Sequence, residues 1–350
     1  MQRRGTMKKR IITILCICSI FCGCQIQQKQ DMAQIQLFAM DTFMDLKATG
    51  KNGEEALLKA EKEIYSLEQL FSSTIEKSEV YAINQYAGEQ PVTVSEDTLC
   101  LIKKAKQYYT LTDGAFDITI APVVKAWGFT EEVKRVPSEE EIQQKLELVG
   151  QDKLQIEEQN NTIYLEQQNM AIDLGGIAKG YASDKVDEIL RQNGVTSAVI
   201  SLGGNVSVIG KRADGSKWRV AVQDPCNTEG YVGILNVENC SVITSGVYQR
   251  FFEQNGKKYH HIIDTKTGKP AQTGLLSVSI VSENGTMADA LSTSLMVMGL
   301  EKGSELWRKS EEFGAIFITE EREIYITEDI AESFELEESA GYHIHVIEKE

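Results

Sequence analysis

The sequence predicts an α+β fold in a single large body, with much of its sheet antiparallel. Strand-like segments bounded by turn residues follow one another along the chain, and helical segments are interspersed without the regular alternation of βαβ units. Hydrophobic residues make up 42% and charged residues 25% of the 350 residues. That ordinary globular composition excludes a disordered chain and a polytopic membrane protein.

Helices are predicted from apolar residues at helical spacing and from residues that begin or end helices. Ser95 and Ser138 are N-cap candidates, and Ser138 opens a capping-box pattern that ends at Glu141. The five expected helices are residues 53–71, a helix from Ser95 to the turn at 112–114, a helix from Ser138 closed by Gly150, residues 177–192 ended by Gly194, and residues 286–298.

Strands are predicted from short apolar or alternating runs between turn residues. Residues 35–48 read as strand, turn, strand, and residues 153–166 as a hairpin around Asn160-Asn161. A short buried strand is expected at 171–174. The other expected strands are 197–201, 218–222, 231–235, 241–244, 259–264 and 276–281. The acidic segment 332–350 is expected to be solvated surface.

The first thirty residues form a separate unit. A basic start precedes an apolar run of 11 residues, 11–21. This run is shorter than the ~20 residues that span a bilayer, but it suits a signal peptide. Gly23-Cys24 follows and resembles a bacterial lipobox, which predicts lipidation of Cys24 and anchoring on the outer face of the cytoplasmic membrane. The alternatives are a plain secretory signal and an uncleaved anchor.

The predicted organisation is a signal peptide over 1–23, a tether over 24–34, one domain over 35–340 and a tail over 341–350. Loss of residues 1–23 would take the net charge from -16 to -21. Such an acidic chain repels phosphates, which excludes nonspecific nucleic-acid binding. An anionic ligand would need a metal ion, a backbone nest or a helix N-terminus.

Three cysteines remain after the leader: Cys100, Cys226 and Cys240. This odd, sparse set is not a disulfide framework. Buried free thiols are the favoured interpretation, and a Cys226–Cys240 pair is the alternative outside the cytoplasm. The four histidines form no zinc motif.

A glycine-rich turn follows the segment ending at Asp173. In Asp173-Leu-Gly175-Gly176-Ile-Ala178-Lys179-Gly180, an apolar strand leads into a turn and then a helix. Glycines let backbone N–H groups approach an anion, and a helix N-terminus adds positive potential. The spacing matches neither a Walker A loop nor a Rossmann fingerprint, which argues against ATP and NAD. The alternative is a purely structural turn.

Asp289 and Thr293 lie four residues apart in an expected helix and therefore share one face, with Ser292 close by. A carboxylate with hydroxyls suits Mg²⁺, which takes few protein ligands and keeps phosphates or waters. The alternative is that Asp289 is a first-turn charge favoured by the helix dipole.

Tyr259-His260-His261 opens a third segment, which ends in the turn Asp264–Gly268. Adjacent residues of a strand face opposite ways, so only one of the two histidines can point into a site. A histidine beside a phosphate can donate a hydrogen bond or shuttle a proton. The turn itself could equally be structural.

Several motifs, taken together in their order, resemble the ApbE family of FAD:protein FMN transferases, which are commonly exported lipoproteins. The resemblance covers roughly residues 35–330. The family often has Pro where this chain has Thr265, which is expected to alter turn rigidity without removing side-chain chemistry. The motifs are Met40-Asp-Thr, Ser78-Glu79 with Asn84, Asp113-Gly-Ala-Phe-Asp117, Trp127-Gly-Phe129, Asp173–Tyr181, Gly203-Gly-Asn205, Thr244-Ser-Gly246, His261–Gly268 and Asp289–Thr293.

The resemblance implies an ApbE-type, T-fold-like body with mixed and antiparallel sheets, packed helices and one elongated FAD cleft. It implies that Mg²⁺ binds the FAD pyrophosphate through the side chains of Asp289 and Thr293 and the carbonyl of Ala178, with Ser292 nearby. The residues that it places around FAD are Met40, Ala115, Phe116, Asp117, Gly175, Lys179, His261 and Asp264.

The implied reaction transfers the FMN moiety of FAD to a Thr or Ser hydroxyl of an acceptor flavoprotein and releases AMP. Asp289 and His261 are the candidate catalytic residues. Export implies an acceptor in a membrane or extracytoplasmic electron-transfer system. The alternatives are an FAD pyrophosphatase that gives FMN and AMP, and a non-catalytic flavin-binding lipoprotein.

Overall fold

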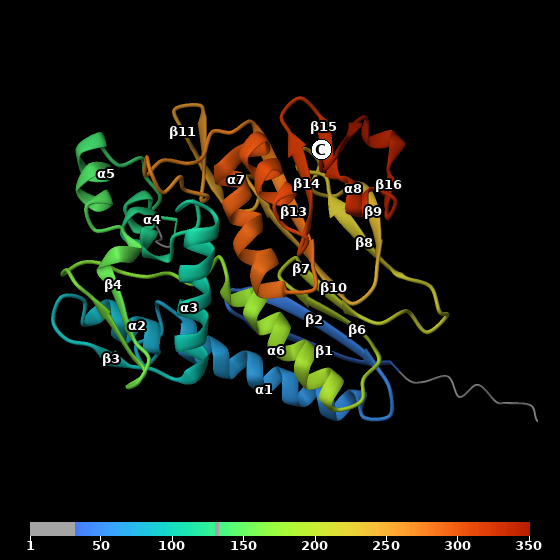
Figure 1. Ribbon diagram of the computed structural model, residues 1–350, viewed down its shortest axis with the longest axis horizontal. Coiled ribbons are helices and arrows are strands. Elements are labelled where there is room, and N and C mark those ends of the chain that lie inside the picture. The colour runs from blue at the N-terminus through green and yellow to red at the C-terminus, as the bar shows by residue number, and fades with distance from the viewer. Residues whose placement is uncertain (1–31, 130–132) are drawn as a thin grey trace, which may run out of the picture.

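A nine-stranded sheet runs the length of the computed structural model, which describes residues 32–129 and 133–350 (Figure 1). The expected signal peptide and Cys24 lie outside the described residues. Neighbouring strands are antiparallel except for the last pair, which is parallel. In spatial order the strands are β1 (Met32–Ala39), β2 (Thr42–Thr49), β6 (Ser197–Leu202), β7 (Asn205–Ile209), β10 (Cys240–Gly246), β13 (Leu275–Ser282), β14 (Gly314–Thr319), β15 (Glu323–Thr327) and β17 (His343–Ile347).

Helices cover one face of this sheet (Figure 1). They are α1 (Gly53–Phe71), α3 (Glu96–Leu111), α6 (Ala178–Gln192) and α7 (Gly285–Arg308). Ile64 of α1 and Leu291 of α7 are fully buried and belong to one apolar cluster with Leu46 and Ile280 of the sheet. Burial of this face is the main source of the fold's stability. The helix expected over 286–298 continues past a kink at Gly299, where φ is 78°.

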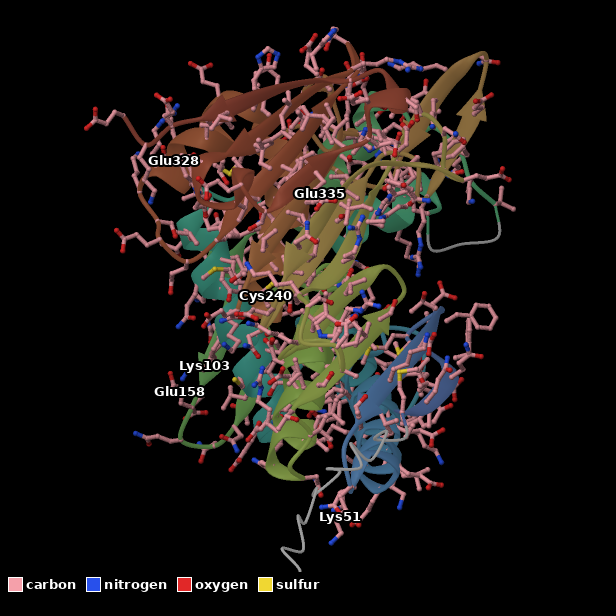
Figure 2. The ribbon with its side chains drawn as sticks, turned by 90° about the vertical axis from the view of Figure 1, so that its right-hand side faces the viewer. Lys51, Lys103, Glu158, Cys240, Glu328 and Glu335 are labelled. Carbon is pink, nitrogen blue, oxygen red and sulfur yellow. The ribbon has the colours of Figure 1, made fainter. Side chains whose placement is uncertain are left out.

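The other face is covered at the carboxyl-terminal half by a small sheet of β16 (Phe334–Leu336), β9 (Tyr231–Val237) and β8 (Trp218–Gln223). Val220 and Leu235 of that sheet share an apolar cluster with Ile316 and Ile318 of β14. Lys51 and Glu328 mark opposite ends of the molecule in Figure 2, with the β1–β2 hairpin at the Lys51 end.

The remaining elements lie around the edges of this body. They are α2 (Glu79–Gln85), β3 (Val92–Thr93), η1 (Ile118–Ile120), α4 (Ala121–Trp127), α5 (Glu139–Leu146), η2 (Gln151–Lys153), β4 (Leu154–Glu157), β5 (Thr162–Leu165), β11 (Phe251–Gln254), β12 (Lys257–His260), α8 (Glu328–Ala331) and η3 (Glu338–Ala340). The predicted α+β class with mixed and antiparallel sheets is confirmed. In the part of the chain that the structure describes, no helix has both the length and the apolar character needed to cross a bilayer.

The predicted caps at Ser95 and Ser138 are confirmed. The hydroxyl of each accepts a hydrogen bond from the backbone N–H three residues later, at 3.3 and 3.2 Å. The helix after Ser138 nevertheless ends at Leu146 and not at Gly150. The chain leaves the helix through bonds between residues three apart, such as Val149 N–H to Leu146 O at 3.0 Å.

The strand expected at 171–174 is not formed. These residues have no regular secondary structure, and the side chain of Asn84 bonds to the backbone where a neighbouring strand would pair. Its amide accepts from Ile172 N–H at 2.7 Å and donates to Ile172 O at 3.0 Å. A side chain 88 positions away can do this only in the folded chain, so local pattern could not reveal it.

One further expectation was wrong and another was incomplete. The strand expected over 259–264 ends at His260, and His261 lies in the bend that follows. The acidic segment 332–350 is not merely solvated surface, because β16 pairs with β9 and β17 pairs in parallel with β15. Tyr342 also donates to Asp224 at 2.6 Å. Residues of the expected 341–350 tail therefore complete the main sheet.

All three described cysteines are free thiols. Cys100 and Cys240 are partly covered, whereas Cys226 is exposed, so burial was predicted wrongly for Cys226. Burial, with the charge of Glu283 adding to it, raises the pKa of the Cys240 thiol to about 12. Cys240 is thus an unreactive thiol at neutral pH.

Candidate functional site

Asp289 is held at the crossing of α6 and α7. Gly180 allows this close approach, because a Cβ there would lie 2.2 Å from Gly285 O and 2.7 Å from the Cβ of Asp289. Gly180 N–H donates to Asp289 Oδ2 at 2.8 Å, and Asn205 Nδ2 donates to Oδ1 at 3.0 Å. Asp289 as a whole residue is only 4% exposed. Two dipolar partners orient this carboxylate without cancelling its charge.

Lys179 supplies the nearest positive charge. Its Nζ lies 4.0 Å from Asp289 Oδ1 and donates to Gly175 O at 3.3 Å. A buried carboxylate is costly without compensating charge, and one ammonium at this distance compensates it only in part. The position therefore suits an additional cation.

Three hydroxyls meet beside Asp289. Ser245 Oγ lies 2.8 Å from Ser292 Oγ and 3.1 Å from Thr293 Oγ1, and Ser292 donates to Asp289 O at 2.9 Å. Each hydroxyl has one proton. The proton of Ser292 is donated to Asp289 O, so Ser245 must donate its own proton to Ser292. Thr293 must therefore donate to Ser245. The lone pairs of Thr293 Oγ1 remain free to face a cation.

The turn before α6 lies against the same group. A Cβ placed on Gly176 would lie 3.8 Å from Thr293 Oγ1 and 3.3 Å from the ring of Phe116. Gly175 N–H donates to Asp173 Oδ1 at 2.7 Å, which folds the turn back on itself. Ala178, the first residue of α6, is buried. The structure thus brings the predicted glycine turn together with Phe116, Lys179, Asp289 and Thr293.

His261 is held by Arg250. Both its backbone N–H and its ring Nδ1 lie 3.1 Å from Arg250 O. Burial, with the positive charges of Arg250 and Lys179 adding to it, lowers the pKa of His261 to about 4. The ring is therefore neutral at pH 7. With the proton on Nδ1 donated to the carbonyl, Nε2 is left as a free acceptor.

The turn after His261 is tied to the segment 113–116. Thr265 Oγ1 donates to Gly114 O at 2.7 Å, and Lys266 Nζ lies 3.0 Å from Asp113 Oδ2. Asp264 shapes the turn by accepting from Lys266 N–H at 2.8 Å. The Thr265 hydroxyl thus tethers this turn to segment 113–116.

The tip of the β1–β2 hairpin closes the arrangement. Met40 and Asp41 have φ of 49° and 59°, as a tight hairpin turn requires. Asp41 pairs with Arg250 at 2.9 Å. On the other side, a Cβ on Gly203 would lie 2.2 Å from Thr42 Oγ1, so the tip packs closely on the turn that precedes Asn205.

These contacts form a closed circuit through the motifs that the sequence singled out. From Asp289 it passes through Asn205, the hairpin tip, Arg250 and His261. It returns through segment 113–116 and the Gly175-Gly176 turn. Segments far apart in the sequence therefore surround one candidate site.

Asp117 serves the fold more than the site. Its Oδ1 accepts from Thr119 N–H at 2.8 Å, from the Thr119 hydroxyl at 2.6 Å and from Gln151 Nε2 at 3.1 Å. Burial raises the pKa of Asp117 despite these bonds. Ala115 lies between the segment's tether at Gly114 and the Phe116 ring that meets Gly176.

Contacts with predicted site residues are also made by three residues that were not themselves predicted, namely Asn205 with Asp289, Ser245 with Thr293 and Arg250 with His261. Asn205 and Ser245 lie in motifs that the sequence had singled out, but nothing in their spacing showed that they would contact Asp289 or Thr293. Arg250 lies in no motif and reaches the site through a fold-dependent ion pair.

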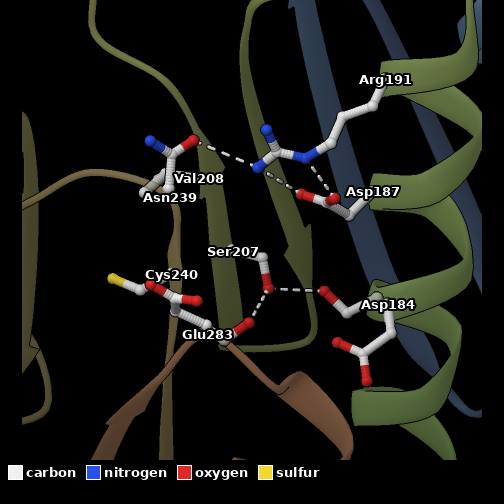
Figure 3. Close-up of a pocket in the computed structure, with 10 residues that line it drawn as sticks. Asp184, Asp187, Arg191, Ser207, Val208, Asn239, Cys240 and Glu283 are labelled. Atoms are coloured by element: carbon white, nitrogen blue, oxygen red, sulfur yellow. Dashed lines mark hydrogen bonds and ion pairs between the residues drawn. The ribbon is translucent and has the colours of Figure 1, made fainter.

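A separate pocket of about 340 Å³ lies between α6 and the strands β7 and β10 (Figure 3). Its hydroxyls satisfy one another, with Ser207 Oγ 2.6 Å from both Ser183 Oγ and Ser241 Oγ. Asp187 is paired with Arg191 at 2.6 Å. None of its lining residues belongs to the predicted site, so this pocket is distinct from the circuit.

Comparison with known proteins agrees with this geometry. The model of the ApbE family matches residues 40–317. The fold and the matched motifs define the chain as a flavin-transferase-type α+β protein, and it belongs to the ApbE family. This confirms the family that the motifs indicated.

Two relatives show how far the similarity extends. The FAD:protein FMN transferase of Klebsiella pneumoniae (strain 342) is 37% identical over 261 residues, which are 74% of this chain and 81% of that protein. The Escherichia coli (strain K12) protein of the same name is 30% identical over 331 residues, covering 90% of this chain and 94% of its own length. The similarity therefore includes nearly the whole described body.

Solved structures share the fold. The ApbE protein of Thermotoga maritima matches with a TM-score of 0.79 at 33% identity, over 87% of this chain and 99% of that one. The flavin transferase ApbE of Vibrio cholerae matches with a TM-score of 0.75 at 29% identity, over 83% and 94%. The predicted ApbE-type fold is thus confirmed.

Proposed function

We propose that this chain transfers the FMN moiety of FAD to a Thr or Ser hydroxyl of an acceptor flavoprotein and releases AMP. The activity named for its relatives supports this proposal. The observation that carries it in this chain is the oriented carboxylate of Asp289, with the free lone pairs of Thr293, facing the glycine turn before α6.

Mg²⁺ at the FAD pyrophosphate is part of the proposal, and the donor set fits it. Asp289, Thr293 and the carbonyl of Ala178 offer hard oxygen ligands, with Ser292 behind Thr293. Among the described residues, no group of three or more His, Cys, Asp and Glu side chains is placed to hold a metal. A single carboxylate suits Mg²⁺, which is commonly completed by phosphates and water. When bound, the ion neutralises pyrophosphate charge and stabilises the departing AMP.

The proposed reaction is an in-line displacement at the FMN-side phosphorus. The acceptor hydroxyl oxygen forms the new P–O bond, the bond to the bridging oxygen breaks, and AMP leaves. The hydroxyl proton passes to His261 Nε2, which is neutral and free to accept it. Asp289 is the weaker base because both of its oxygens already accept hydrogen bonds. Lys179 lies where it can contribute positive charge to the pyrophosphate.

The test combines purified protein, FAD, Mg²⁺ and a candidate acceptor, with in-gel flavin fluorescence and chromatography of AMP. Transfer predicts a fluorescent acceptor and equal amounts of AMP, both abolished by chelation and by Asp289→Asn. Free FMN and AMP without labelled acceptor would instead identify a pyrophosphatase. FAD binding that is indifferent to Mg²⁺, without turnover, would identify a binding protein.

We also propose that the chain is exported and anchored through lipid on Cys24, so that its acceptor belongs to a membrane or extracytoplasmic electron-transfer system. The basic, apolar and cysteine-bearing order of residues 1–24 supports this. Cys24→Ser should move the protein from the membrane to the soluble fraction and abolish labelling by a palmitate analogue. Membrane association that survives this substitution would contradict the anchor.

A further inference from the structure

Two exposed phenyl rings stand at the tip of the β1–β2 hairpin. Phe38 and Phe43 face each other across the hairpin, with ring centroids 5.1 Å apart and planes at 72°. They are 53% and 81% exposed. Large apolar side chains left in water on a folded surface are a common mark of an interaction site when they gather together.

Between the phenyl pair and Met32, which is 57% exposed at the other end of β1, that face is polar, so the two rings stand apart. Along the same face of the hairpin, Gln34 donates to Asp45 at 2.7 Å and Lys47 pairs with Asp45 at 3.3 Å. The opposite face, with Leu37 and Met44, is buried in the core. The alternation of the strands points positions 38 and 43 outward. It does not require phenyl rings there, because polar residues fill the neighbouring equivalent positions of both strands.

The hairpin tip is fixed to both sides of the candidate site. Phe43 O accepts from Gly203 N–H at 3.1 Å, next to the turn that leads to Asn205 and so to Asp289. Asp41 pairs with Arg250, which holds His261. The phenyl pair is therefore continuous with the rim of the site, between the carboxylate and the histidine.

We infer that the Phe38–Phe43 pair is the surface on which the acceptor protein docks the apolar, uncharged residues beside its target hydroxyl. This inference rests on the proposed transfer reaction, in which a segment of another protein must enter between His261 and Asp289. The one charged side chain at the tip, Asp41, already pairs with Arg250. The tip therefore offers apolar area and no free charge, which fits a neutral segment.

The observations favour a protein partner over a lipid surface. The chain enters the fold at Met32, which follows the proposed anchor, and the phenyl pair lies at the other end of β1. At ~3.3 Å per residue, that places the rings roughly 20 Å from the start of the strand. Continuity with the site explains their position, whereas a lipid contact would not require it.

The test compares Phe43→Ser and the double variant Phe38→Ser/Phe43→Ser with the conservative Phe43→Leu. Val346→Ser is the matched control, because Val346 is 52% exposed on β17 at the far edge of the sheet. Four quantities are measured for each: the KM for acceptor protein, the affinity for FAD by flavin fluorescence, the thermal midpoint, and binding to anionic vesicles. We expect the serine variants to raise the acceptor KM about tenfold or more, with Phe43→Leu retaining most of the function and Val346→Ser unchanged. FAD affinity and thermal midpoint should stay at the parent values.

Three results would overturn the inference. An acceptor KM within twofold of the parent in the double variant would show that the rings are not used. An equal loss of FAD affinity would assign the rings to the flavin. Loss of binding to anionic vesicles, with the acceptor KM unchanged, would assign them to a membrane. If the unmodified protein labels no acceptor, the proposed function itself is wrong. The three results above are obtained only with an active parent protein, so they test the role of the rings separately.

Discussion

The two sides of the candidate site are built differently. The Asp289 side lies where two helices cross over the sheet, and its polar groups are buried and bonded. The His261 side consists of turns joined by exposed ion pairs, such as Asp41–Arg250 with side chains 80% and 54% exposed. Buried groups are held by packing, whereas exposed pairs contribute little each. The Asp289 side should therefore be rigid and intolerant of change, and the His261 side adaptable.

The largest effect is expected for Asp289→Asn. The amide keeps the shape but removes the charge that would hold a cation, so the rate of FMN transfer should fall by about a thousandfold. Stopped assays of AMP release measure it. The control is Asp187→Asn, which lies in the separate pocket between α6 and strands β7 and β10 and should change the rate less than twofold. Comparable rates for the two variants would contradict the role assigned to Asp289.

Gly180→Ala should be the next most damaging. Its Cβ would overlap Gly285 O and force α6 and α7 apart, at a cost of about 2–4 kcal/mol in the free energy of unfolding. Gly215→Ala is the control, because Gly215 has φ of 83° and open space around it. That variant should lose only ~1 kcal/mol, from backbone strain alone. Equal losses in urea titrations would show that the helix crossing is not tight.

His261→Gln should lower the transfer rate about a hundredfold, the usual contribution of a positioned base. The pH dependence of kcat/KM gives a second test of the role of His261. Because the pKa of His261 is lowered to about 4, the base is lost only as pH falls through that region. The acid limb of kcat/KM should thus lie well below pH 6.5, and it should vanish in the glutamine variant. An acid limb near 6.5 would mean that His261 is not buried as described.

The smallest effect is expected for Thr265→Val on the adaptable side. It removes the hydroxyl bond to Gly114 O, which is worth about 1 kcal/mol, so the KM for FAD should rise about threefold to tenfold. Thr267→Val, in the same turn, is the control. A loss as large as that of Asp289→Asn would refute the contrast between the two sides.

Much of the secondary structure could be predicted because its causes are local. Helix α1 has the predicted bounds, since apolar spacing and a following break lie in one segment. The absence of a strand at 171–174 could not be predicted, because the backbone of Ile172 bonds instead to Asn84, which lies far away in the chain. β17 was missed for a similar reason: its alternating residues look solvated until β15 pairs with them.

The site shows the same division. Asp289 and Thr293 share a helix, so their common face follows from spacing alone. The contact of Asn205 with Asp289 and of Ser245 with Thr293 depends on how strands and helices pack, which no spacing encodes. The resemblance to the family indicated that these segments belong to one site, but only the fold shows which side chains are in contact.

If this site moves FMN from FAD to another protein, the acceptor must gain mass. The decisive measurement is intact-protein mass spectrometry of an acceptor after incubation with the chain, FAD and Mg²⁺. We expect an acceptor heavier by one FMN, no such shift with Asp289→Asn, and no shift when the target Thr or Ser is replaced by Ala. An acceptor of unchanged mass beside free FMN and AMP would contradict FMN transfer.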